Sequence, residues 1–474
     1  MLTPLLPIVL LGTAFVGLTL LFRPQLSAPV FGLAMPLAAV TLPGGIYLVQ
    51  LLSLVLIGVA ILTRLEDGLT PLPLNWPVLM ATVWSLGVMA STTFSDDLSG
   101  SLILGAWQIA AALLAVAWAE LTGSPQRLRP ALMAWLVGSV VVGLTGVVGA
   151  QGLQASYGGA VVSGRAQGIF SQPNEYGFYC MVTVIFALGV AVLTRGWLRR
   201  VAILSLAVCS VGLLLSLSRG AWTGTAVGVV VLVIAIPQTR RPVAIGLLAI
   251  VGALATLWVA APNSPLLQIL VERVLSIGDR GANPYDNRPT LVAEGIRQWL
   301  SAPVFGHGPN SYPRLASGVE SMARPEGAEH AHNLWVTLGA EQGLIGVAAM
   351  IGFGVVVVAT AHRFRPRVVA AHRAGGSWLG RANRAAARSR ATAVSLPAAV
   401  TLSAACSLSS ILVEGLADYP LRNAIVRNVM WVMIGWVLAG RRIDDSDRAA
   451  AGTDAAVTPV PAPSEPEGAS PTLA

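Results

Sequence analysis

Long apolar segments recur along the whole chain, separated by short polar or proline-containing connections, and they predict an all-α protein that crosses a membrane many times. Each segment approaches or exceeds the roughly 20 residues that a helix needs to cross a bilayer. The pattern therefore predicts about twelve membrane spans, near residues 4–22, 44–63, 75–94, 99–121, 128–150, 173–194, 198–216, 220–237, 242–261, 333–361, 392–417 and 424–440.

One further apolar stretch, 27–42, is shorter than the others and is interrupted by Pro29 and Pro36. Proline removes a backbone hydrogen-bond donor and breaks or kinks a helix. We expect this stretch to be re-entrant or to lie at the membrane interface. If it crossed the membrane, the chain would have thirteen spans and one of its ends would change sides.

The spans divide the chain into four parts. The segment 1–261 carries the first nine spans, and 262–332 is a large loop between the ninth and tenth. The segment 333–442 carries the last three spans and contains a basic connection at 362–391. The tail, 443–474, is rich in Ala, Pro, Ser, Asp and Glu and lacks an apolar period, so we expect it to be disordered.

The composition excludes a soluble protein of this size. Hydrophobic residues make up 55% of the 474 residues and charged residues only 11%, and the mean hydropathy is +0.71. Soluble domains carry about 25% charged residues. The three cysteines lie inside apolar spans and have no disulfide or metal-binding spacing. The net charge of +8 comes from arginines in the connections, which indicates membrane topology and not nucleic-acid binding.

Arginine placement predicts the orientation. With both termini in the cytoplasm, arginines concentrate in the inner connections, as the positive-inside rule requires of a plasma or inner membrane protein. The short outer segments hold four arginines. The inner connections hold Arg64, Arg127, Arg129, Arg195, Arg199, Arg200, Arg240, Arg241, Arg441, Arg442 and eight more in 362–391.

The outer connections gather groups that can bind an anion and move a proton. Arg165, Arg219 and Arg288 are suited to bidentate recognition of phosphate. His332, at the start of the tenth span, can take a proton near neutral pH. Each residue also has a structural interpretation, because arginines near a membrane surface extend to lipid headgroups and a histidine at a helix start can cap the helix.

Other polar residues near the outer side are open to similar alternatives. Glu341 lies inside the tenth span, where a carboxylate is costly and therefore a functional candidate. Asp418 and Arg422 flank a turn and are interpreted as a local ion pair. His307 lies among glycines and is interpreted as a turn residue.

Several motifs, taken in order over roughly 160–350, resemble those of the O-antigen ligase and O-antigen polymerase superfamily. The pattern H-[N/S/Q]-x9-G-x-x-G is matched at His332-Asn333 and Gly343 to Gly346. The other matches are Gly168-Ile169-Phe170 with Pro173-Asn174, Ser218-Arg219-Gly220-Ala221-Trp222, and Arg288 followed by Trp299, Pro303 and Phe305-Gly306-His307-Gly308-Pro309.

The resemblance implies an integral-membrane glycosyltransferase of the GT-C-like type. It implies an undecaprenyl-diphosphate-linked glycan donor, an acceptor hydroxyl on a glycan, lipid or protein, and transfer on the extracytoplasmic face without a metal or other cofactor. By position, Arg219 and Arg288 match the arginines that hold the donor diphosphate, and His332 matches the proposed base. Arg165, Asn174 and Asn333 are the further candidates for substrate binding.

Three functions remain open at this point. A ligase and a chain polymerase share these motifs and differ only in the acceptor. A transporter or flippase for lipid-linked oligosaccharides is the alternative from another class. A transporter keeps ionisable residues near the middle of the bilayer, whereas these spans hold few, mainly Glu341, Glu414 and Arg427.

The topology makes the first prediction. Single cysteines at positions 165, 219, 288 and 332 should react with a membrane-impermeant maleimide in intact cells, and cysteines in 362–391 should react only after lysis. Labelling of position 288 only after lysis would reverse the orientation and place the arginines and His332 in the cytoplasm.

Overall fold

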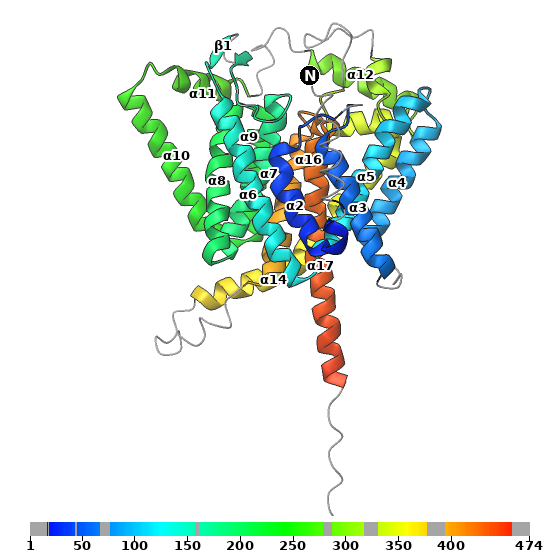
Figure 1. The fold of residues 1–474 in the computed structure, drawn as a ribbon. Coiled ribbons are helices and arrows are strands. Elements are labelled where there is room, and N and C mark those ends of the chain that lie inside the picture. The colour runs from blue at the N-terminus through cyan, green and yellow to red at the C-terminus, as the bar shows by residue number, and fades with distance from the viewer. Residues whose placement is uncertain are drawn as a thin grey trace, which may run out of the picture.

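The protein is a bundle of long helices with a cap of short elements at one end (Figure 1). The computed structural model describes residues 17, 19–42, 45–66, 76–156, 161–277, 287–316, 330–376 and 394–456. The helices and strands are α2 (Ser27–Ala34), α3 (Leu48–Glu66), α4 (Trp76–Thr93), α5 (Leu98–Thr122), α6 (Pro125–Gly149), β1 (Gln154–Ser156), β2 (Val161–Ser163), α7 (Pro173–Leu193), α8 (Gly196–Ser216), α9 (Arg219–Ala235), α10 (Arg240–Ala260), α11 (Pro265–Leu275), α12 (Arg288–Ser301), α13 (Tyr312–Leu315), α14 (Leu334–Gly376), α16 (Leu396–Glu414) and α17 (Ala424–Ala456), with 3-10 turns η2 (Pro24–Leu26), η3 (Met35–Leu37), η4 (Pro237–Thr239) and η5 (Pro420–Arg422).

The described helices agree with the predicted spans. Nine of them are long and apolar enough to cross a membrane, and two shorter apolar helices, in α4 and α9, lie at two further predicted spans. These helices fall on eleven of the twelve predicted positions, so the all-α polytopic class is confirmed. Most of the first predicted span, 4–22, lies outside the described residues.

The stretch 27–42 forms α2 and a 3-10 turn instead of one helix of span length. At 1.5 Å per residue, the eight residues of α2 cover about 12 Å, well short of the ~30 Å hydrocarbon layer. Glycines allow α2 to lie directly on α6, because a Cβ on Gly138 would be 2.0 Å from the carbonyl oxygen of Gly32. Small residues at such contacts are typical of helix packing in membranes.

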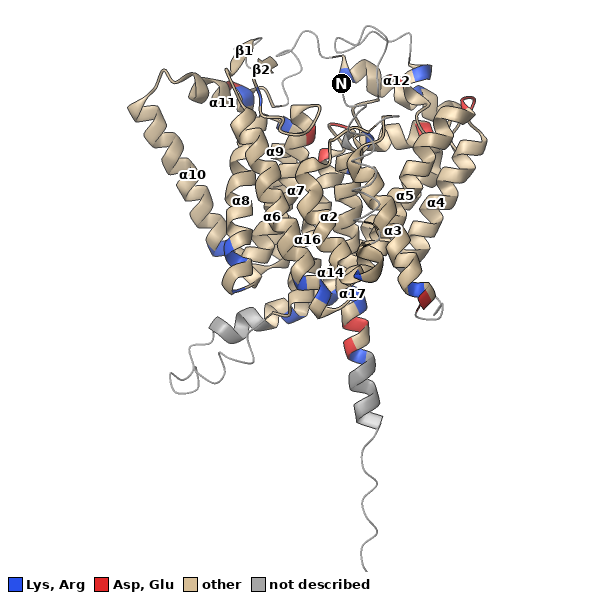
Figure 2. Ribbon diagram, in the orientation of Figure 1, with Lys and Arg blue, Asp and Glu red and all other residues tan. Residues whose placement is uncertain are grey.

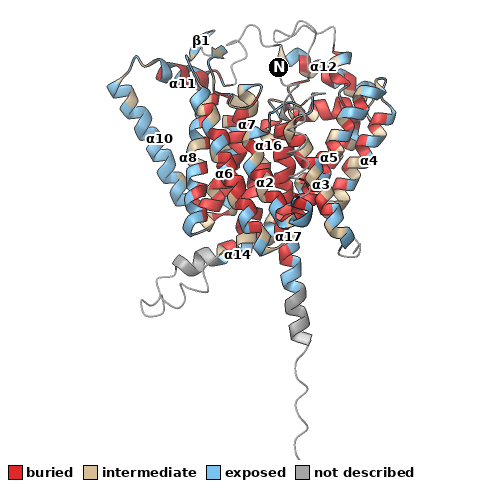
Figure 3. Cartoon of the chain, in the orientation of Figure 1, coloured by how far each residue is buried: buried red, intermediate tan, exposed pale blue. Residues whose placement is uncertain are grey.

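Helix α7 forms the centre of the bundle and packs against α8, α9 and α16, while α17 packs between α5 and α16. Most residues of these central helices are buried, whereas α10 stands at the edge and has no buried residue (Figure 3). The main contacts of α10 with the described residues are with short elements at its two ends, η4 and α11. Its apolar side chains therefore face the lipid.

A row of glycines brings α9 against α16 and α7. Gly220, Gly224 and Gly228 recur every fourth residue and face these neighbours. A Cβ on Gly224 would be 2.5 Å from the sulfur of Met181 and 3.1 Å from the carbonyl oxygen of Ser410. This close contact fixes the first turn of α9, and with it Arg219, beside the outer end of α16.

Helix α14 is broken at Gly343, whose φ of 63° and ψ of −159° are not helical. The glycine-rich turn after α12 fills the break: the backbone N–H groups of His307 and Gly308 donate to the carbonyls of Ala340 and Glu341 at 3.0 and 2.8 Å. In return, the N–H of Leu344 donates to the carbonyl of Pro303 at 2.8 Å. The backbone groups released by the break are thus paired within the protein, as an apolar environment demands.

Arginines concentrate at the end of the bundle opposite the cap, where α14 and α17 extend from the bundle (Figure 2). There Glu120 of α5 accepts from Arg64 of α3 at 3.1 Å and from Arg442 of α17. Asp444 forms ion pairs with Arg363, at 3.0 Å between Nε and Oδ2, and with Arg367. These ion pairs hold the ends of α3, α5, α14 and α17 together.

The expected disorder from residue 443 is wrong for the first part of the tail. Helix α17 continues to Ala456, and the remainder, 457–474, lies outside the described residues. The extension is alanine-rich and carries the i,i+4 pairs Arg441–Asp445 and Arg448–Asp444, which stabilise a helix. The basic connection 362–391 is likewise helical as far as Gly376, and the segment 377–393 is not described.

The break in α14 makes the second prediction. Gly343→Ala should lower the free energy of unfolding by about 2–4 kcal/mol, because that conformation is accessible essentially only to glycine. A Cβ there would also be 2.3 Å from the carbonyl oxygen of Val304. Gly354→Ala on the same helix is the control, since its Cβ would meet only Leu412 at 3.7 Å. Thermal unfolding followed by size-exclusion chromatography measures both, and equal midpoints would contradict this role for Gly343.

Candidate functional site

The Ser218-Arg219-Gly220 motif forms the junction between α8 and α9. Leu217 ends α8 with a left-handed φ of 51°, and the Ser218 side chain caps α9 by accepting from the N–H of Ala221. Arg219 occupies the first turn of α9, and its Nη1 donates to the carbonyl oxygen of Ser276 at 2.6 Å. The motif therefore directs one guanidinium toward the end of α11.

Arg273 of α11 contacts the same junction and was not identified from the sequence. Its Nε donates to the carbonyl oxygen of Leu217 at 2.9 Å, and its side chain is buried. Burial, followed by the charges of Arg165, Arg219 and Arg288, lowers the pKa of Arg273 to about 9. In the sequence it is an arginine on an amphipathic helix, which is indistinguishable from a solvated surface residue.

Arg165 reaches the site from the loop after β2. Its Nε donates to the carbonyl oxygen of Ser216 at 2.6 Å, and its Nη2 donates to Oδ1 of Asn174 at 2.7 Å. Burial lowers the pKa of Arg165 to about 10, with further lowering by Arg288 and Arg219. The hydrogen bond to Ser216 also holds this loop onto the end of α8.

Arg165, Arg219, Arg273 and Arg288, which we call the arginine cluster, thus come from four separate segments and lie within electrostatic reach of one another. Arg288, the first residue of α12, acts on both Arg165 and Arg273. Like charges held together in a poorly solvated place repel one another, and a bound anion relieves that repulsion. The cluster is therefore a candidate anion site.

His332 lies against Asp418, a residue 86 positions away in the sequence. The Nδ1 of His332 is 3.1 Å from Oδ1 of Asp418. Because a carboxylate can only accept, Nδ1 carries the proton and Nε2 is left as the basic nitrogen. The side chain of His332 is 30% exposed and that of Asp418 only 14%, so a hydroxyl from outside can reach the imidazole.

The Asp418 carboxylate has further partners. Oδ1 also accepts from the N–H of Tyr419 at 2.8 Å, and Oδ2 accepts from Nδ2 of Asn174 at 3.1 Å. Burial would raise the pKa of Asp418, but the hydrogen bond from His332 and the charges of His332, His330 and Arg288 hold it well below its usual range. Asp418 is therefore ionised, and its hydrogen bonds join His332 and Asn174 to the turn that it shares with Arg422.

His330, to which the sequence assigned no role, supports His332. Its Nδ1 accepts from the backbone N–H of His332 at 3.1 Å, and the two rings are 4.3 Å apart. Burial, opposed by Asp418 and reinforced by His332, Arg422 and Arg288, lowers the pKa of His330 to about 3. This neutral ring helps to hold the left-handed backbone of His332, whose φ is 49°.

Asn174 and Asn333 act mainly within the fold. Asn174 accepts from Arg165 and donates to Asp418, so hydrogen bonds run from Arg165 through Asn174 and Asp418 to His332. The Oδ1 of Asn333 accepts from the N–H groups of Trp335 and Val336, and its Nδ2 donates to the carbonyl of Leu416. Asn333 thus caps α14, which favours a positioning role over the predicted contact with substrate.

His330, His332 and Asp418 also have ligand atoms within 4.8 Å of one another, a spacing that suits a metal ion. However, the Nδ1 atoms of both histidines and both oxygens of Asp418 already take part in hydrogen bonds. The nearby Arg288 adds positive charge that opposes a second cation. We therefore interpret the three residues as a hydrogen-bonded group that orients His332.

The remaining sequence candidates lie close by. His307 is a turn residue as predicted, with its Nε2 2.8 Å from Oγ of Ser301 and 3.1 Å from the carbonyl of Gln298. Glu341 is buried beside the break in α14. Its backbone carbonyl accepts from Ser91 at 2.6 Å and from the N–H of Gly308.

The fold and the site together define a polytopic membrane protein with an arginine cluster and a histidine–aspartate pair at one end of its helix bundle. Residues 204–351 match the family model described as O-Antigen ligase, which confirms over this segment the superfamily that the motifs predicted. The match includes Arg219, Arg273, Arg288 and His332. No curated protein matches the chain. The family supports a glycosyl-transfer-related enzyme of surface polysaccharide biosynthesis that uses a lipid-linked glycan and an acceptor.

Proposed function

We propose that this protein transfers a glycan from an undecaprenyl-diphosphate-type lipid donor to an acceptor hydroxyl on the extracytoplasmic face of the inner or plasma membrane. The arginine cluster is the observation that carries the proposal. Four guanidinium groups from β2–α7, α9, α11 and α12 converge at the end of the bundle that also holds His332. Planar guanidinium groups suit the paired oxygens of a diphosphate, and their charge stabilises it as a leaving group.

In the proposed reaction, Nε2 of His332 takes the proton of the acceptor hydroxyl. The acceptor oxygen bonds to the anomeric carbon as the bond from that carbon to the diphosphate oxygen breaks. The lipid diphosphate leaves with the electron pair, held by the arginine cluster, and the proton on His332 passes to water. Asp418 keeps Nδ1–H oriented and stabilises the imidazolium. A single displacement of this kind inverts the anomeric carbon.

The positions of the intramembrane charges favour transfer over transport. Glu341 lies in the first part of α14, Glu414 is the last residue of α16, and Arg427 lies in the first turn of α17. All three are therefore near the same end of the bundle as the arginine cluster. A carrier that alternates access about the bilayer midplane places its ionisable residues deeper.

The third prediction is the transfer itself. Purified protein in lipid nanodiscs should move the glycan of an undecaprenyl-diphosphate-linked donor to one of two offered acceptors, lipid A core or a growing repeat-unit chain, and release undecaprenyl diphosphate. Arg219→Lys and Arg288→Lys should each lower kcat/KM about 10- to 100-fold, since an ammonium does not reproduce the guanidinium fork. EDTA should have no effect.

The acceptor that is used separates a ligase from a polymerase of the same superfamily. Activity that EDTA abolishes and Mn²⁺ restores would instead assign His330, His332 and Asp418 to a metal. Movement of the donor across the bilayer without release of lipid diphosphate would favour a flippase.

The fourth prediction concerns His332 in the same assay. His332→Ala should lower kcat about 10²- to 10⁴-fold, as loss of a general base does. His332→Asn is the sharper test, because asparagine tolerates a left-handed backbone and keeps a hydrogen bond to Asp418 but cannot take the proton. The exposed His362 on α14 gives the control, His362→Asn. Full activity of a folded His332→Asn protein would remove proton transfer to His332 from the mechanism.

A further inference from the structure

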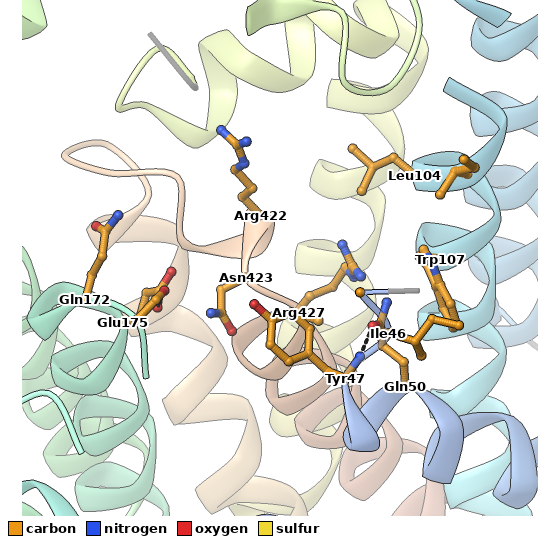
Figure 4. Close-up of a pocket in the computed structure, with 14 residues that line it drawn as sticks. Ile46, Tyr47, Gln50, Leu104, Trp107, Gln172, Glu175, Arg422, Asn423 and Arg427 are labelled. Carbon is orange, nitrogen blue, oxygen red and sulfur yellow. Dashed lines mark hydrogen bonds between the residues drawn. The ribbon is translucent and has the colours of Figure 1, made fainter. Parts of the chain in front are cut away.

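A second site lies beside the Asp418 turn, in a cavity of about 780 Å³ (Figure 4). The cavity is bounded by the start of α3, the outer half of α5, the start of α7, and η5 with the first turn of α17. None of its lining residues belongs to the arginine cluster or to the pair His332–Asp418. Its volume falls within the range of about 300–1,000 Å³ that is usual for small-molecule sites.

The lining combines flat aromatic surface with side chains that form hydrogen bonds. Tyr47 and Trp107 lie on one side of the cavity, and Gln172 and Glu175 lie on the opposite side (Figure 4). The Glu175 carboxylate accepts from Oγ of Ser171 at 2.7 Å. An aromatic face packs against the C–H face of a sugar ring, while amides and carboxylates bind its hydroxyls. This combination suits a saccharide.

Two arginines make the lining of the cavity basic. Arg422 and Arg427 both line the cavity, against the single carboxylate of Glu175 among the lining residues. The side chain of Arg427 extends into the cavity between α17 and α5 and is 4% exposed (Figure 4). Its Nε has no hydrogen-bond partner among the described residues. A buried guanidinium is costly without a counter-charge, so a ligand that carries an acid would stabilise it.

The cavity adjoins the reacting groups along two segments. Arg422 follows Asp418 within the same turn, and Gln172 and Glu175 flank Asn174, whose side chain contacts Asp418. A ligand in the cavity would therefore lie next to the histidine–aspartate pair while leaving the arginine cluster to the diphosphate. An acceptor needs such a position, since its hydroxyl must reach His332 without displacing the leaving group.

We propose that this cavity binds the acceptor as an acidic saccharide, with Arg427 and Arg422 on its carboxylate or phosphate group and Trp107 against a sugar ring. The assignment to the acceptor rests on the proposed transfer reaction. The inference that the cavity binds an acidic saccharide does not rest on that reaction, because it follows from the residues that line the cavity.

Binding to the full chain in nanodiscs tests the site without any turnover. Trigalacturonic acid should bind, and maltotriose, a neutral saccharide of the same length, should not. Arg427→Gln and Trp107→Ala should each weaken binding about tenfold or more, the effect of losing one contact to a charged or stacked group. Trp197→Ala, which removes an exposed tryptophan of α8, is the matched control. Unchanged size-exclusion profiles show that the variants fold, and Trp107→Ala keeps the test independent of the buried arginine.

A substitution in the arginine cluster separates this cavity from that cluster. Arg219→Ala should leave the binding of trigalacturonic acid unchanged. Equal binding of maltotriose, or loss of binding in Arg219→Ala but not in Arg427→Gln or Trp107→Ala, would overturn the site.

Steady-state kinetics then test the assignment to the acceptor. In the transfer assay, Trp107→Ala should raise KM for the acceptor and leave KM for the donor unchanged. A rise in the donor KM alone would assign the cavity to the donor glycan and overturn the proposal. Binding that depends on Arg427 in a protein that performs no transfer would leave the saccharide site standing while the proposed function fails.

Discussion

The carboxylate of Asp418 joins the parts of this protein that the site requires. It accepts hydrogen bonds from His332 at the start of α14, from Asn174 at the start of α7 and from the backbone of its own turn. Through Asn174 it is also linked to Arg165 and so to the end of α8. One half-buried anion therefore sets the tautomer of the histidine and links four helix ends to one another.

The arginine cluster places several positive charges around this anion. Burial, followed by repulsion within the arginine cluster, lowers the pKa values of Arg165 and Arg273, and the fold tolerates both effects. The close packing of α9 on α16, by way of Gly220 and Gly224, and the filled break in α14 provide the rigidity that holds these charges together. An anionic substrate would lower the free energy of the site, which is the behaviour expected of a site built for a charged leaving group.

Much of the fold was predictable because hydropathy alone defines membrane helices. The gathering of Arg165, Arg219, Arg288 and His332 was also predictable, since topology places their connections on one side. The partners of these residues were not. Asp418 lies far from His332 in the chain, and only the packing of α14 against α16 brings them together.

Arg273, which the sequence analysis missed, carries no distinctive signal, because it is one basic residue on an amphipathic helix. Arg427 was noted only as an ionisable residue within a span, and nothing in the sequence indicated the cavity that it lines. The motif glycines are informative for another reason: Gly306, Gly308 and Gly343 adopt positive φ where the turn enters α14. The glycine-rich part of the family motif thus determines a backbone conformation, whereas its arginine and histidine are the groups proposed to act on the substrate.

Helix α10 has no buried residue, and its main contacts with the described protein are with η4 and α11 at its two ends. The surrounding lipid layer therefore has a large part in setting its tilt and depth. Only residues 261–264 separate α10 from α11, which carries Arg273 into the arginine cluster. A change in the tilt of α10 would therefore reach the arginine cluster through a connection of only these few residues, which places that cluster one short step from the lipid-facing edge of the molecule.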